Sequence, residues 1–313
     1  MRHWRTRVES PNLTIRPEVV IKSCERIDDL QCNGYQIIQN SGMFCFGMDA
    51  VLLANYVRFK RGGRYLDLGT GTGIIPILLA AKEYGEGALT REERLAGLNA
   101  DACRSSHDCI AVDGVTNSDA GVNQQPSGKM ADGARFIGIE LQSACADMAA
   151  RSVSLNGLDG LVRIDNGDIK EVSCNYKKAS FDIVTSNPPY IKGSHGLENP
   201  DAPKNIARHE VHVTLNQVVA AAEYALKPGG SFYMIHKPFR LAEIFECLHE
   251  HRLEPKRMQL VHPYIDKEPN MVIVEAVKGG NSMIKIDPPM IVYKAPGVYT
   301  EQLLATYEGS AKR

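Results

Sequence analysis

Short apolar runs alternate with segments of helical periodicity through the middle of the chain. Four runs have the length and apolar content of buried strands, at residues 64–68, 134–140, 162–165 and 181–184. Segments at residues 74–81 and 142–155 follow the first two runs and carry apolar residues at helical spacing. Strands that alternate with helices in this way predict an α/β fold with a mostly parallel sheet.

The C-terminal part continues this alternation and then changes character. We expect a helix at residues 215–226, a strand at residues 231–236 and a helix at residues 241–248. Two further strand-like runs, at residues 258–262 and 271–276, suit an antiparallel end to the sheet. Residues 286–293 contain a second Pro-Pro but no strand–turn–helix pattern, so we interpret them as an edge segment and not as a second site.

The N-terminal part predicts a hairpin followed by a helix. The runs at residues 30–32 and 35–38 flank Asn33-Gly34, a dipeptide that supplies the positive-φ positions of a type I′ turn. The helix is expected from about Asp49 to Val57. We interpret the aromatic residues just before it as packing, although a lid over a bound cofactor would use the same residues.

Two stretches depart from the pattern of a compact fold. Residues 1–25 are mixed and polar, and we expect a poorly ordered extension. Residues 84–134 are rich in Gly, Asn, Asp, Ser and Ala with little apolar periodicity. A segment this long inside a compact domain is a lid, a binding loop or disordered, and of these we favour a disordered insertion. The prediction is a single domain at residues 26–313 that this insertion interrupts.

Composition narrows the possible classes of function. The chain has 36 Lys and Arg against 37 Asp and Glu, and therefore no excess of positive charge. Any nucleic acid would have to bind a local basic patch. The 8 cysteines include no C-x-x-C pair, which predicts no metal site and suits a reducing compartment. We see no signal peptide and no membrane span, and therefore expect a cytoplasmic protein.

A glycine-rich turn follows the first strand, in the sequence DLGTGTG at residues 67–73. Gly69, Gly71 and Gly73 let the backbone turn sharply and bring a ligand against bare main chain at a helix N-terminus. The spacing is G-x-G-x-G and not the G-x-G-x-x-G of a dinucleotide site. Asp67 would repel a pyrophosphate but could hold a cationic group, which favours S-adenosylmethionine over NAD.

Acidic residues also follow the next two strands. Glu140 ends one strand, about twenty residues past the glycine turn once the insertion is removed, where an acid in such folds takes ribose hydroxyls. Asp168 comes just after the strand at residues 162–165. A single carboxylate in this position would be an ordinary turn residue, whereas Asp67, Glu140 and Asp168 on successive strand ends suggest a ring around one polar ligand.

The stretch Asn187-Pro188-Pro189-Tyr190 follows the strand at residues 181–184. Ligands of open α/β sheets bind outside the carboxyl ends of the strands. There the Asn187 oxygen and a carbonyl of the rigid prolines would be two acceptors beside a flat ring, suited to a planar group with an NH2. On its own the stretch could equally be a proline turn that ends a strand.

With these features in this order, the chain resembles the class I S-adenosylmethionine-dependent methyltransferases that act on nitrogen. It is most similar to the tRNA adenine-N6 methyltransferases of the tRNA1(Val) type, through residues 26–30, 37–39, 44–53 and 207–210. The resemblance runs from about residue 26 to the C-terminus without the insertion. It implies a Rossmann-like fold with a mostly parallel seven-stranded sheet, an antiparallel last strand and helices on both faces.

The resemblance also implies roles for individual residues. The cofactor would be S-adenosyl-L-methionine, bound by Asp67, Gly69, Thr70, Gly71, Gly73, Glu140, Asp168 and Asn187. The substrate would be tRNA, with a methyl group transferred to N6 of the adenine next to the anticodon. The catalytic residues would be Asn187, Pro188, Pro189 and Tyr190. Lys192, Lys204, Arg208 and His209 could meet phosphates, with solvated loop charge as the alternative.

Other functions remain open at this stage. A protein-glutamine N5 methyltransferase would use the same tetrapeptide on a side-chain amide. Enzymes of that class have a longer helical N-terminal domain, and the short hairpin of this chain argues against it. A DNA adenine methyltransferase needs a target-recognition domain, for which the polar insertion is a poor candidate. A catalytically idle RNA-binding or cofactor-sensing module, and a nicotinamide oxidoreductase, are the remaining alternatives.

Overall fold

A computed structural model describes residues 19–32, 34–43, 45–84, 133–189 and 213–307. Most of the expected N-terminal extension and of the insertion lies outside these ranges. So do Asn33 and Phe44 from the N-terminal predictions. The first half of the chain contains β1 (Glu25–Asp29), β2 (Gln36–Asn40), α1 (Met48–Tyr56), β3 (Tyr65–Leu68), α2 (Ile74–Tyr84), β4 (Phe136–Glu140), α4 (Ser143–Leu155) and β5 (Val162–Asn166).

The second half adds the rest of the sheet and its far helices. It contains a 3₁₀ turn at Ile169–Glu171, α5 (Val172–Asn175), β6 (Phe181–Ser186), α6 (Leu215–Ala225), β7 (Leu226–His236), a 3₁₀ turn at Pro238–Arg240, α7 (Leu241–Glu250), β8 (Leu253–His262) and β9 (Met271–Lys278). Short elements follow, β10 (Lys285–Ile286), β11 (Met290–Ile291), β12 (Tyr293–Ala295), β13 (Val298–Tyr299) and α8 (Glu301–Tyr307).

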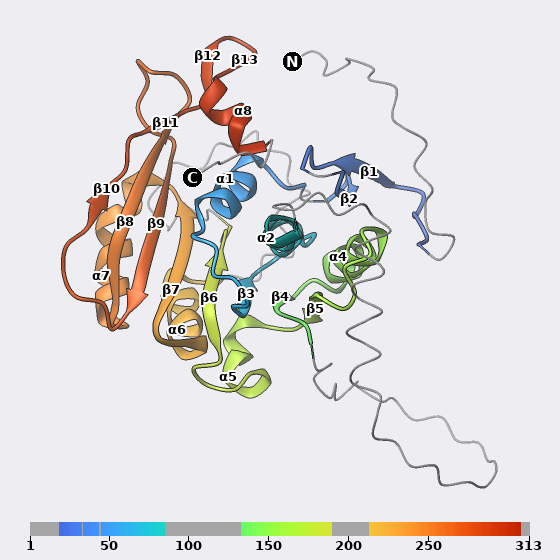
Figure 1. Cartoon of the computed structure of the whole chain (residues 1–313), viewed down its shortest axis with the longest axis horizontal. Coiled ribbons are helices and arrows are strands. Elements are labelled where there is room, and N and C mark those ends of the chain that lie inside the picture. The colour runs from blue at the N-terminus through green and yellow to red at the C-terminus, as the bar shows by residue number, and fades with distance from the viewer. Residues whose placement is uncertain (1–18, 33, 44, 85–132, 190–212, 308–313) are drawn as a thin grey trace, which may run out of the picture.

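The central sheet has the order β10-β8-β9-β7-β6-β3-β4-β5, and β11 also pairs with β8 (Figure 1). Strands β3 to β7 pair in parallel, and β9 is antiparallel to both β7 and β8. The predicted mostly parallel sheet with an antiparallel strand is therefore confirmed, but in the described ranges the sheet has nine strands and not the predicted seven. The strands β10 and β11 extend it along β8, where an edge segment was expected.

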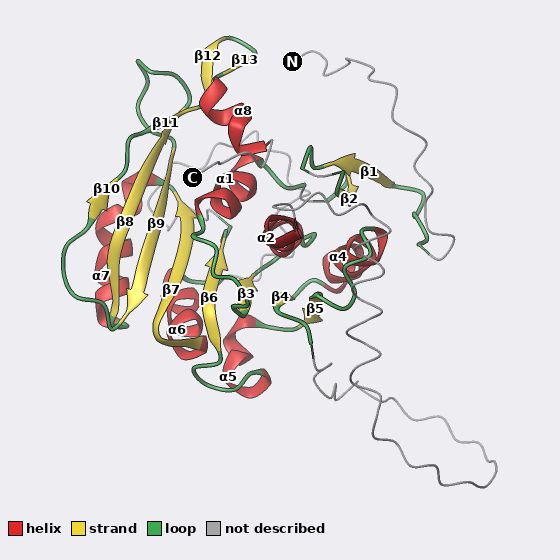
Figure 2. Cartoon of the chain, viewed as in Figure 1, coloured by secondary structure: helices red, strands yellow, loops and turns green. Residues whose placement is uncertain are grey.

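Helices cover both faces of the sheet, as predicted (Figure 2). Side chains alternate along each strand between the two faces. Tyr65 packs into the cluster that holds α1 and α2, whereas Leu66 and Leu68 pack into the cluster that holds α6 and α7. Phe46, just before α1, also packs against the first cluster, which confirms the packing interpretation for that residue. In the part of the chain that the structure describes, no helix is long and apolar enough to cross a bilayer.

The predicted N-terminal hairpin exists, but its first strand was placed wrongly. β1 covers residues 25–29 and pairs with β2 so that Asp29 lies opposite Gln36. Leu30, Cys32 and Tyr35 are buried in the connection, where the N–H groups of Leu30 and Tyr35 donate to the carbonyls of Tyr35 and Cys32. The apolar residues thus mark a packed loop, and the polar strand before it carried no hydrophobic pattern.

The start of β7 also differs from the prediction. Residues 227–230 were expected as a turn before a strand at residue 231, but the strand begins at Leu226. The pairing with β6 shifts between Phe181 and Ile183, and Gly229 has φ +74°. Pro and Gly are tolerated inside a strand at such an irregularity, because the ladder is interrupted there.

Candidate functional site

The sheet register brings the predicted site segments to one edge. Leu68, the last residue of β3, lies opposite Ile139 of β4 and Ser186 of β6. Glu140 in turn lies opposite Asn166 of β5. Gly69, Glu140 and Asn187 each directly follow one of these three paired residues. They therefore lie at the carboxyl ends of adjacent strands. This is the edge at which open α/β sheets bind ligands.

The glycine turn presents bare main chain at this edge. Gly69 and Gly71 have φ values of +73° and +58°, which side chains rarely adopt, and a Cβ on either would meet no atom within 4 Å. At Gly73 (φ +84°) a side chain is excluded for a second reason, because a Cβ there would lie 3.0 Å from the Cβ of Ala149 in α4. The first two glycines thus leave room for a ligand, and the third allows a helix to pack closely.

Glu140 holds this turn in place. Its Oε2 accepts a hydrogen bond from the Gly71 N–H at 2.9 Å, and its Oε1 accepts one from the Gln142 N–H at 2.9 Å. Each carboxylate oxygen can accept a further bond, so the predicted role toward sugar hydroxyls fits the structure. The second link, to the residue before α4, was not apparent from the sequence.

Asp67 is a buried carboxylate whose two oxygens differ in their hydrogen bonding. It is 2% exposed, and its Oδ1 accepts a hydrogen bond from the Thr185 hydroxyl at 2.7 Å. Among the described residues its Oδ2 has no hydrogen-bond partner, and neither has the Oγ1 of Thr70. Burial raises the pKa of Asp67 to about 6, the Thr185 hydroxyl opposes this and Glu140 adds to it. A buried carboxylate oxygen without a donor is rare, and it fits a cationic ligand group.

Asp67→Asn should increase the free energy of unfolding by about 1–2 kcal/mol above pH 6. The pKa of Asp67 is raised from 3.8 to about 6, so folding must keep a costly buried charge at high pH. This cost is absent below pH 3.8, grows as the pH rises to about 6 and is complete above it. Urea unfolding at pH 4.5 and pH 8 measures the difference.

The exposed acid Asp266 provides the matched control for this prediction. Asp266→Asn should change the free energy of unfolding little and equally at the two pH values. An Asp67→Asn protein less stable than wild type at pH 8 would contradict the assigned cost of the buried charge.

Asp168 stands two residues past the end of β5. It is half-buried, and its Oδ1 accepts a hydrogen bond from the Lys170 N–H at 2.9 Å, so it caps the 3₁₀ turn that follows. Asn166 links this strand end to the next one by donating to the carbonyl of Glu140 at 2.8 Å. The structure thus brings Asp168 to the same edge and gives it a local turn role as well.

The first part of the tetrapeptide follows β6 directly. Asn187 is half-buried, Pro188 is buried and Pro189 is exposed. The two residues before it tie β6 to β3, because Thr185 donates to Asp67 and the Ser186 hydroxyl donates to the Leu68 carbonyl at 2.9 Å. The remaining predicted site residues lie outside the described residues: Tyr190, Lys192, Lys204, Arg208 and His209.

Thr185 and Gly138 are site residues that the sequence reasoning missed. Thr185 lies opposite Asp67 in the register of β6 and β3, and Gly138 lies opposite Asp67 on β4. A Cβ on Gly138 would come within 2.7 Å of the Thr70 side chain, so this glycine makes room for the turn. Both roles depend on strand pairing, which no pattern within a single strand reveals.

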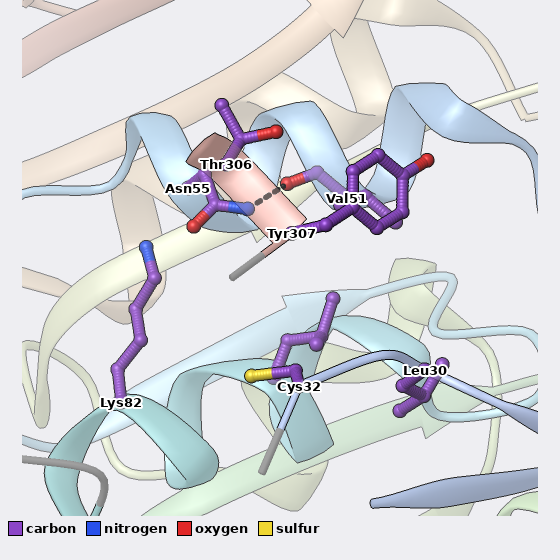
Figure 3. Close-up of a pocket in the computed structure, with 8 residues that line it drawn as sticks. Leu30, Cys32, Val51, Asn55, Lys82, Thr306 and Tyr307 are labelled. Carbon is purple, nitrogen blue, oxygen red and sulfur yellow. Dashed lines mark hydrogen bonds between the residues drawn. The ribbon is translucent and has the colours of Figure 1, made fainter. Parts of the chain in front are cut away.

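A small crevice elsewhere has a different character. It lies among the β1–β2 connection, α1, α2 and α8. Figure 3 shows Asn55 and Thr306 above it and Leu30 and Cys32 below it, with Lys82 at its left. The Lys82 ammonium donates to the Ala54 carbonyl, and the Asn55 amide donates to the Val51 carbonyl at 3.0 Å. The predicted site residues that the structure describes do not line it.

Comparison with known proteins supports the predicted resemblance. No family model matches the chain. A tRNA1(Val) (adenine(37)-N6)-methyltransferase from Porphyromonas gingivalis is 28% identical over 180 residues, which are 56% of this chain and 69% of that protein. A protein of the same name from Aeromonas salmonicida is 22% identical over 259 residues, 82% of this chain and 86% of that protein.

A solved structure shows the same fold. The crystal structure of a predicted O-methyltransferase from Agrobacterium tumefaciens superposes with a TM-score of 0.56 and 18% identity. The superposition covers 83% of this chain and 96% of the Agrobacterium chain. The Rossmann-like, class I methyltransferase fold expected from the sequence is confirmed.

Proposed function

We propose that this chain transfers a methyl group from S-adenosyl-L-methionine to the N6 amine of an adenine in tRNA. The observation that carries the proposal is the register of β3 and β6, which sets the glycine turn and the buried Asp67 carboxylate beside Asn187 and Pro188. One oxygen of that carboxylate has no hydrogen-bond partner among the residues that the structure describes. The names of the relatives supply the finer substrate, adenine 37 of tRNA1(Val). A tRNA substrate also makes the cytoplasm the expected location.

The cofactor half of the site is formed by β3, β4 and β5. When bound, S-adenosylmethionine supplies an activated methyl group on a sulfonium. Asp67 Oδ2 is the acceptor for its ammonium, and Glu140 is the acceptor for its ribose hydroxyls. Asp168 is assigned to the adenine amine. The turn of Gly69, Thr70, Gly71 and Gly73 approaches the ligand with main chain alone, in agreement with the open space above its first two glycines.

The acceptor half of the site follows β6. The Asn187 side-chain oxygen and the Pro188 carbonyl accept the two N–H groups of the target amine, which directs the nitrogen lone pair toward the methyl group. Pro189 restricts the backbone, and Tyr190 stacks on the base once it has left its own stack. These residues hold and orient the amine, and such positioning can supply much of the rate enhancement.

The domain organisation and the tRNA contacts complete the proposal. The chain is one methyltransferase domain at residues 26–313, interrupted at residues 84–134. Lys192, Lys204, Arg208 and His209 contact tRNA phosphates, so affinity for tRNA should fall steeply as salt rises.

Two measurements test the function. Calorimetry should show that S-adenosylhomocysteine binds the purified protein and that NAD does not. Unmodified tRNA incubated with the protein and S-adenosylmethionine should then contain N6-methyladenosine by mass spectrometry of its nucleosides. Methylation of protein glutamine in place of tRNA, or binding of NAD alone, would refute the proposal.

A further inference from the structure

Thr185 is the hydrogen-bond donor that fixes the Asp67 carboxylate. The two residues lie opposite each other in the pairing of β6 and β3, and they are 1% and 2% exposed. The Thr185 hydroxyl donates to Asp67 Oδ1 at 2.7 Å. The other oxygen, Oδ2, is buried and has no partner among the described residues. The bond from Thr185 therefore determines which carboxylate oxygen remains available.

Burial and one neighbouring acid disfavour the charge of Asp67, and two threonine hydroxyls favour it. Burial has the largest effect and raises its pKa to about 6. The charged side chain that acts on it from the neighbouring strand end is Glu140, itself an acid, which raises the pKa further. The Thr185 hydroxyl lowers the pKa most, because it donates to the ionised form, and the nearby Thr70 hydroxyl lowers it as well.

From this geometry we propose that Thr185 is a positioning residue that keeps Asp67 ionised and leaves its second oxygen for the ammonium of the cofactor. The inference rests on the proposed function, since it assigns that ammonium to Asp67. Thr185 also lies two residues before Asn187, so a single side chain links the strand that carries the acceptor residues to the cofactor carboxylate. Its effect on methyl transfer acts through Asp67, and it need not touch substrate.

Thr185→Val keeps the shape of the side chain and removes its hydroxyl. At pH 7 this variant should bind S-adenosylhomocysteine about tenfold more weakly, because a hydrogen bond to an ionised group is lost. Wild-type affinity should fall as the pH drops through about 6, where Asp67 takes up a proton. In the variant this fall should occur at a higher pH, and Thr185→Ser should restore the wild-type profile.

Two controls separate this role from a general effect on structure. Thr185→Val should bind 5′-methylthioadenosine as wild type does, since this compound lacks the ammonium. Ser186→Ala removes a neighbouring hydroxyl contact between β6 and β3 and should leave the midpoint of the pH profile in place. An unchanged pH profile in Thr185→Val, or equal loss of both compounds at every pH, would overturn the inference. Wild-type protein that binds neither compound would refute the proposed function itself.

Discussion

Asn187→Ala should lower the rate of methyl transfer about 10²–10³-fold, while S-adenosylhomocysteine still binds. The side-chain oxygen of Asn187 is assigned to hold one N–H of the target amine at the carboxyl end of β6. Without it the amine keeps its nitrogen lone pair in conjugation with the ring and loses its orientation. The effect belongs to the chemical step, so single-turnover rates with saturating cofactor and tRNA measure it.

Asn281 offers a matched control for this substitution. Asn281 is exposed and follows the end of β9. The last residue of β9 pairs with the first residue of β8, so Asn281 lies at the edge of the sheet opposite to the glycine turn. Asn281→Ala should therefore transfer methyl groups at the wild-type rate. An Asn187→Ala protein that binds cofactor and keeps most of its single-turnover rate would remove Asn187 from the catalytic step.

Arg257→Met should lower the free energy of unfolding by about 3–5 kcal/mol. Arg257 lies in β8 and is 4% exposed. Its Nε donates to Glu275 of β9 at 2.6 Å and its Nη2 donates to the Tyr56 carbonyl at the end of α1 at 2.7 Å. Its guanidinium also lies 3.8 Å from the centroid of the Tyr56 ring and 3.4 Å from a carboxylate oxygen of Asp287.

The cost arises from the partner that remains. Glu275 is also 4% exposed. Within the described part of the chain, its side chain without Arg257 keeps the Tyr233 hydroxyl at 2.9 Å and Arg58 at 3.9 Å. An uncompensated buried charge costs several kcal/mol, whereas removal of both members of a buried pair costs much less. The double variant Arg257→Met with Glu275→Leu should therefore recover most of the loss.

Urea unfolding of the single and double variants measures these differences. Lys267→Met serves as the surface control, because it breaks an exposed pair with Asp266 and should cost at most about 1 kcal/mol. A single Arg257→Met variant that is no less stable than the Lys267→Met control would contradict the assigned role of the network.

The sequence predicted elements well where hydrophobic pattern and turn residues agreed. α4 ends at Leu155 and Gly157 has φ +67°, which is the conformation that Asn156-Gly157 indicated. Predictions were wrong where burial did not follow a regular period. Leu30 and Cys32 are buried in a loop, and the polar β1 is stabilised by pairing with β2 and by Glu25 contacts with Arg151 of α4.

The sequence by itself determined the alternation of strands and helices, the glycine turn and the placing of acids and of Asn187 at strand ends. These are local, since a turn conformation or a strand end depends on a few neighbouring residues. Only the tertiary structure decided which strand lies beside which. The pairing of β3 with β6 places Thr185 against one oxygen of Asp67, and the other oxygen has no partner in the described ranges. Strand register joins residues that are far apart in the chain, so its consequences for charge and position exist only in the folded protein.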